Sequence, residues 1–151
     1  QYDVAFHTTH RRLVLYLFAI QVTLMDTQKF FLIAGAALGG LGVAVGAFGA
    51  HALRPTLEAA GRLDTFETAV KYQFYHAFAL LAVGLLAQRI GSPLLSYSGH
   101  AFLAGTLVFS GSLYVLCLTG IRWLGAVTPL GGVLMIAGWG LLAWAVAKAN
   151  L

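Results

Sequence analysis

Five of the six glycines between Ala34 and His51 constrain this chain more than any other feature of its sequence. They are Gly35, Gly39, Gly42, Gly46 and Gly49, spaced by four, three, four and three residues. At about 100° per residue they fall on one narrow stripe of an α-helix. In water each would cost a helix about 0.8–1.0 kcal/mol relative to alanine. In lipid the helix satisfies its own backbone, and a stripe without side chains lets another backbone approach closely. The spacing therefore predicts a helix–helix contact surface inside a membrane.

The composition also indicates a membrane protein. Of 151 residues, 60% are hydrophobic and 9% are charged, and the mean hydropathy is +0.84. Soluble domains carry roughly 25% charged residues, and a domain of this length buries only ~70% of its surface. Lipid must therefore solvate much of the chain. The net charge of +4 sits at helix ends and in loops, which is typical of membrane flanks and not of a nucleic-acid-binding patch. Cys117 lies alone in an apolar segment and is interpreted as a small packing residue.

Four apolar segments are long enough to cross a bilayer. They are predicted at residues 30–51, 68–88, 100–120 and 129–147. Between the first two, Pro55 can open a short helix and Gly61 can end it, and this helix is expected to lie on the membrane surface. The sequence thus predicts an all-α fold: an integral membrane four-helix bundle with a short interfacial helix between spans 1 and 2, placed multi-pass in a bacterial plasma membrane.

Signals at the ends of the spans refine these bounds. Asp64 and Glu67 have the spacing of a capping box for the second helix. His100 is expected to open the third helix after a polar turn. For the fourth helix a start at Trp123 is compatible with the sequence, but a start at Pro129 is favoured because proline suits the first helical position.

Small residues also recur at intervals of seven in the last two spans. The positions singled out are Gly105 and Ser112 in the third span, and Gly131 and Gly138 in the fourth. Seven-residue spacing favours a left-handed bundle, so these positions are expected to contact other helices.

The first 24 residues differ from the rest. Their apolar run, residues 13–24, covers about 18 Å as a helix and is too short to span a core of ~30 Å. Two interpretations stay open: an extension of the reading frame upstream of Met25, or a short interfacial helix. The four-span domain is taken as residues 25–151.

Four sequence blocks in the spans resemble a known family. They are GAFGAHAL (46–53), FETAVKYQFYHAFALL (66–81), FSGSLYVLCLTG (109–120) and TPLGGVLMIAGW (128–139). They are similar to small membrane proteins that include bacterial YgdD- and YwdK-like proteins and a eukaryotic transmembrane relative. The resemblance covers the chain from about Phe30 and implies a four-helix integral membrane protein with no established activity. It supplies no catalytic residues.

The polar residues within the spans suggest one cluster. His51 ends the first span, and Tyr72, Gln73 and His76 enter the second span from the same membrane face. We expect His51 and His76 to lie within one side chain of each other, joined through Tyr72 or Gln73. Such a cluster is either a hydrogen-bonded clasp between two helices or a functional site, because ionisable groups at membrane depth are costly.

No catalytic or metal-binding pattern accompanies this cluster. Ser110 and Ser112 lack a GxSxG frame, and no carboxylate shares the face of His76. We therefore expect no cofactor and no enzymatic activity. The favoured interpretation is a structural or accessory membrane protein that packs through its glycine stripes, with lipid around it and a second copy or another membrane protein as its partner. The alternative is a small transporter or proton-conducting element that uses His51 and His76.

The N-terminal segment gives the first testable prediction. A chain that starts at Met25 should insert into membranes and unfold in detergent at the same temperature as the full chain, because residues 1–24 lie outside the bundle pattern. Degradation or failed insertion of the shorter chain would show that the segment is needed for targeting or packing.

Overall fold

The chain folds as helices joined by short turns. The computed structural model describes the backbone of residues 2–149 and the side chains of residues 26–149, and this part contains no strand. Its elements are α1 (Tyr2–Ala50), α2 (Arg54–Ala59), α3 (Leu63–Leu86), α4 (Pro93–Thr119), the 3₁₀ helix η1 (Arg122–Ala126) and α5 (Thr128–Ala147). The prediction of an all-α fold is confirmed.

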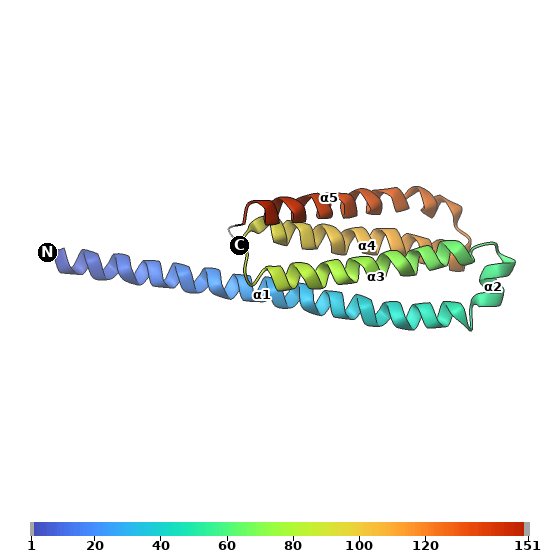
Figure 1. Ribbon diagram of the computed structural model, residues 1–151, viewed down its shortest axis with the longest axis horizontal. Coiled ribbons are helices and arrows are strands. Elements are labelled where there is room, and N and C mark those ends of the chain that lie inside the picture. The colour runs from blue at the N-terminus through green and yellow to red at the C-terminus, as the bar shows by residue number, and fades with distance from the viewer. Residues whose placement is uncertain (1, 150–151) are drawn as a thin grey trace.

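Four of these helices are long and apolar enough to cross a membrane. The candidate spans are Asp26–Ala50, Leu63–Leu86, Pro93–Thr119 and Arg122–Ala147. Figure 1 shows them side by side in the order α1, α3, α4, α5, and each packs along its neighbour in that order. Because the connections are short, consecutive helices run antiparallel. The four candidate spans agree with the even number of crossings that the sequence predicts.

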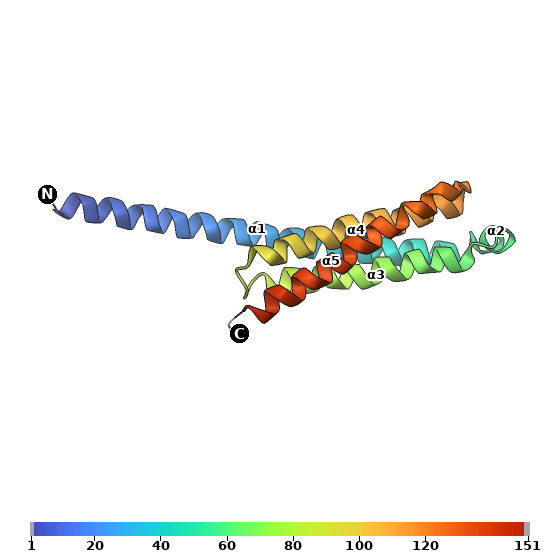
Figure 2. The same ribbon diagram turned by 90° about the horizontal axis from the view of Figure 1, so that it is seen from above.

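Helix α1 is much longer than a bilayer is thick. Its 49 residues would measure about 73 Å, and its N-terminal part extends beyond the other helices in both views (Figure 1, Figure 2). The helix runs without a break into the candidate span, because no glycine or proline lies between Tyr2 and Ala34 to interrupt it. The backbone of residues 2–24 is continuous with the helix of the first span. The two interpretations of the N-terminal segment, and its dispensability, stay predictions.

The ends of α3 and α4 differ from the sequence-based bounds. Gly61 adopts a left-handed conformation (φ 62°), and α3 begins directly after it, with Arg62 and not Asp64 at the N-cap. The predicted capping box is therefore wrong, and Asp64 lies in the first turn. Helix α4 begins seven residues before His100, because Ser92 caps it by accepting a hydrogen bond from Leu94 N (3.3 Å) and Pro93 occupies its first turn. The predicted polar turn before residue 100 is thus mostly helical.

The ends of α2 and α5 agree with the sequence. Pro55 lies in the first turn of α2, and Pro129 lies in the first turn of α5. Trp123 belongs to η1, the tight turn that follows the left-handed Gly120 (φ 80°). The last helix starts at Thr128, within one residue of the predicted start at Pro129.

Most glycines of the α1 stripe face α3. A Cβ atom on Gly42 would lie 2.9 Å from the Phe74 ring, and one on Gly46 would lie 3.3 Å from Val70. Gly35 and Gly49 likewise face α3, at Leu81 and Phe66. Gly39 is different, since a Cβ there would meet no atom within 4 Å. The stripe is therefore interrupted at its second position.

Between α4 and α5 the two backbones themselves come close together. A Cβ on Gly131 would lie 2.5 Å from the backbone nitrogen of Phe109 and 2.7 Å from the carbonyl oxygen of Gly105. A Cβ on Gly138 would lie 2.7 Å from the Phe102 ring, and Ser112 Oγ lies 2.8 Å from Thr128 Oγ1. The small residues predicted in spans three and four thus face each other.

Adjacent glycines in α5 provide a matched test of this packing. Gly131→Ala should lower the free energy of unfolding in detergent by about 1–3 kcal/mol, because the new methyl group meets backbone atoms that cannot rotate away. Gly132→Ala should be neutral or stabilising, since its Cβ would find ordinary contacts at 3.9 Å and alanine is the better helix former. Equal stabilities of the two variants would contradict the close approach.

Candidate functional site

The predicted contact between His51 and His76 is not formed. Gly49 of α1 lies opposite Phe66 of α3, so His51, two residues further along α1, lies level with the first turn of α3. His76 lies about twelve residues further along α3, which corresponds to roughly 18 Å along the helix axis. His51 is exposed in the turn after α1, whereas His76 is 4% exposed. The prediction relied on both residues entering from the same membrane face and did not allow for the helical rise between the start of α3 at Leu63 and His76.

Gln73 is the residue of the predicted cluster that joins helices. Its Nε2 donates a hydrogen bond to the carbonyl oxygen of Leu38 on α1 (2.8 Å), and its Oε1 accepts one from the hydroxyl of Tyr114 on α4 (2.8 Å). The side chain is 5% exposed. One amide therefore links three helices inside the span, where unpaired polar groups are costly.

Sequence reasoning missed Tyr114 as the partner of Gln73. One signal was available: Tyr114 lies within an apolar span, whereas membrane tyrosines are enriched at the interfaces. A tyrosine away from the interface needs a hydrogen-bond partner, and Gln73 was the uncharged side chain with a free acceptor at comparable depth.

His76 packs among aromatic rings. Its ring centroid lies 5.5 Å from that of Phe102 and 6.2 Å from that of Trp139. Its Nδ1 lies 2.8 Å from the carbonyl oxygen of Tyr72, and since a carbonyl only accepts, Nδ1 carries the proton and donates. Nε2 is then a bare acceptor. It is the single buried side-chain polar atom without a partner among residues 26–149.

The side chains of Tyr72 and His100 take no part in the bonds of Gln73. The Tyr72 ring stacks on His76 (centroid distance 6.2 Å) and on Phe109 (4.6 Å), and Tyr72 is 39% exposed. His100 contacts the ring of Phe31 near the other end of the bundle. The described side chains include no group of three histidine, cysteine, aspartate or glutamate residues that could hold a metal ion.

Serine hydroxyls add further bonds between helices. Ser110 Oγ donates to the carbonyl oxygen of Ala69 on α3 (2.8 Å), and Ser98 Oγ donates to that of Gly138 on α5 (2.8 Å). Together with Gln73, they connect α1 to α3, α3 to α4, and α4 to α5 in the interior. The polar side chains thus tie the helices together in the order in which they pack.

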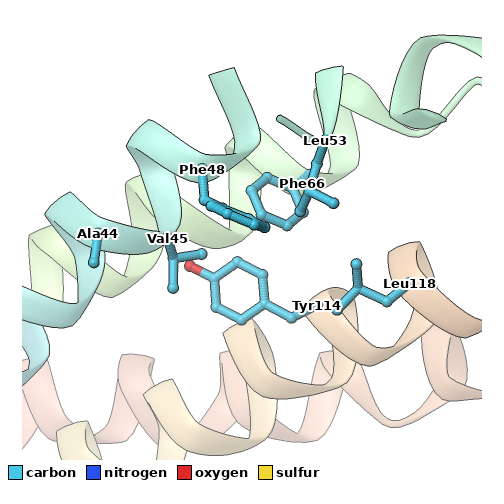
Figure 3. A pocket seen from close by; sticks show the side chains of 7 residues that line it. All are labelled: Ala44, Val45, Phe48, Leu53, Phe66, Tyr114 and Leu118. Atoms are coloured by element: carbon cyan, nitrogen blue, oxygen red, sulfur yellow. The ribbon is translucent and has the colours of Figure 1, made fainter. Parts of the chain in front are cut away.

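A hollow of about 480 Å³ lies between α1 and α4 near the end of the bundle that carries α2. Figure 3 shows its lining, in which side chains from both helices point toward each other across the hollow. The lining residues are Ala44, Val45, Phe48, Leu53, Phe66, Tyr114 and Leu118. Apart from the Tyr114 hydroxyl, which Gln73 already binds, the lining side chains are apolar.

Fold and site together define a multi-pass integral membrane protein whose interior polar groups join its helices. The chain belongs to the family described as protein of unknown function (DUF423), whose model matches residues 45–132, more than half of the chain. The family resemblance inferred from the sequence is thereby confirmed.

Several bacterial relatives support this assignment. The chain is 43% identical over 121 residues to a UPF0382 membrane protein of Staphylococcus epidermidis, covering 80% of this chain and 98% of that protein. It is 42% identical over 122 residues to the UPF0382 membrane protein YwdK of Bacillus subtilis, with coverage of 80% and 98%. It is 41% identical over 116 residues to the UPF0382 inner membrane protein YgdD of Escherichia coli, with coverage of 77% and 88%. No solved structure matches the chain.

The bond between Gln73 and Tyr114 can be tested by a double-mutant cycle. Gln73→Leu should lower the free energy of unfolding in detergent by about 1–3 kcal/mol, because it leaves the hydroxyl of the half-buried Tyr114 without an acceptor. Adding Tyr114→Phe should recover part of this loss, since it removes the unpaired group. The exposed Tyr97, changed to Phe, is the control. Strictly additive effects of the two changes would contradict the bond.

Proposed function

We propose that this chain is a structural or accessory membrane protein that acts through contacts within the bilayer and not through catalysis or transport. The observation that supports this proposal best is the use of its interior polar side chains. Gln73, Ser98 and Ser110 each bond a neighbouring helix, so they hold the fold together.

The glycine positions also support contacts with a partner in the bilayer, but through fewer glycines than the sequence analysis expected. Those of α1 that face α3, and those of α4 and α5 that face each other, are occupied by contacts within the chain itself. Gly39, Gly40 and Gly111 have no atom near their Cβ positions. These open positions are where a second copy or another membrane protein can approach the backbone of α1 or α4 closely.

The alternative, a transporter or proton-conducting element built on His51 and His76, has less support. Roughly 18 Å separates the two residues along α3. His76 alone keeps an unpaired acceptor within the described part of the spans, and a buried ionisable group at that depth is a functional candidate. His76 is therefore the residue at which the two functions can be told apart.

His76→Phe separates the structural from the conducting function. Phenylalanine keeps the ring contacts with Phe102 and Trp139 and removes the unpaired nitrogen, so the free energy of unfolding should be unchanged or higher. Proteoliposomes that carry the wild-type chain should show no pH-driven proton flux above that of protein-free vesicles, and His76→Phe should not change this result. The wild-type chain should also co-purify in mild detergent with another membrane protein or with a second copy of itself.

A proton flux that requires His76 would overturn the proposal in favour of conduction. Tyr75→Phe serves as the control, because Tyr75 precedes His76 on α3 and its side chain is exposed. Removing this hydroxyl should leave both the stability and the flux of the wild-type chain unchanged.

A further inference from the structure

The hollow between α1 and α4 is a groove that continues into the span. A second hollow of about 230 Å³ shares Val45 and Tyr114 with the first and reaches Leu38 of α1. Its lining also includes the polar residues Gln73, Thr106 and Ser110, whose side chains are hydrogen-bonded within the chain. On α1 the two hollows together extend from Leu38 to Phe48, which is about 15 Å of helix, and Leu53 adds lining from the turn after α1. The groove thus runs from within the span to the end of the bundle at which α2 lies. Its rim is exposed, since Phe48 is 59% and Leu118 60% exposed.

The lining of the larger hollow fits a hydrocarbon chain. On α1 this lining runs from Ala44 to Phe48, and Leu118 of α4 lies on the other side. The Tyr114 hydroxyl is already bonded to Gln73, so an acyl chain here leaves no polar group of the lining without a partner.

A positive charge lies at the interfacial end of the groove. Arg62 Nη1 donates to the carbonyl oxygen of Cys117 (3.3 Å), one residue before the groove-lining Leu118. Two other cations of this region are engaged differently: Arg54 pairs with Glu58 and Lys71 with Glu67. Arg62 forms no ion pair with the described carboxylates, and a guanidinium has five N–H donors. Its remaining donors can bind a phosphate through charge-assisted hydrogen bonds.

We infer that this groove binds a phospholipid with an anionic headgroup, with one acyl chain along α1 and α4 and the phosphate at Arg62. The apolar lining of the larger hollow excludes a polar ligand, and the charge at the open end selects an anion. The site opens to the membrane leaflet at the end of the bundle where α2 lies. It exists whether or not the chain also packs against another protein.

Native mass spectrometry of the full, delipidated chain in mild detergent tests the site, with phosphatidylglycerol and phosphatidylcholine as probes. The wild-type chain should retain phosphatidylglycerol at least about threefold more than phosphatidylcholine. Ala44→Trp fills the groove from α1 and should lower retention of either lipid about tenfold. Ala47→Trp, on an exposed α1 position that does not line the groove, should retain both lipids as the wild type does.

A second variant distinguishes filling of the groove from misfolding as the cause of lost lipid binding. Leu118→Trp fills the groove from α4 at an exposed position, and should also lower retention about tenfold. If Ala44→Trp and Leu118→Trp unfold at the wild-type temperature and keep wild-type retention, the inference is overturned. It is also overturned if filling the groove converts a dimer into a monomer without changing lipid retention, because the occupant is then a second copy.

The headgroup contact has its own pair of variants. Arg62→Gln should reduce the preference for phosphatidylglycerol to about one while the acyl chain still binds. Arg122→Gln removes an exposed charge from the same end of the bundle and should leave the preference unchanged. Equal loss of preference in both variants would mean that the charge of the whole surface, and not Arg62, attracts the lipid, and would overturn the assignment of the phosphate to Arg62.

Discussion

Lipid offers a peptide group no hydrogen-bond partner and gives apolar helices little reason to associate. Helices in a bilayer therefore depend on close backbone approach, and in this chain that approach occurs at glycine. It is closest between α4 and α5, where a Cβ on Gly131 would meet the backbone of Phe109 and Gly105. Dispersion contacts at such short separation, summed along the helices, stabilise the arrangement in place of the hydrophobic effect.

The hydrogen bonds between helices follow from this proximity. A serine hydroxyl is short, so Ser98 and Ser110 reach carbonyl oxygens of neighbouring helices because the backbones lie close together. Gln73 is longer and crosses to both α1 and α4. Each bond satisfies a group that would otherwise be unpaired in a region without water, and each also fixes how far one helix can slide along the next.

The same arrangement separates an occupied interior from a surface open to lipid. Glycines and hydroxyls are used between helices, while α1 and α4 meet over only a short stretch and leave the apolar groove between them. His76 is the exception inside the bundle, because its Nε2 has no partner among the described residues. The surfaces that face lipid are therefore where a binding function of this chain is expected.

Local periodicity and composition are enough to predict four spans, the short α2, the start of α5 within one residue of Pro129, and the small residues of α4 and α5 that face each other. Which residues of different helices meet could not be predicted in this way and is seen in the folded chain. The tertiary structure separated His51 from His76, paired Gln73 with Tyr114 and left Gly39 without a contact. The physical reason is that periodicity defines a face within one helix, whereas the axial register between two helices depends on how bulky side chains such as Phe66 and Phe74 fit against the partner backbone.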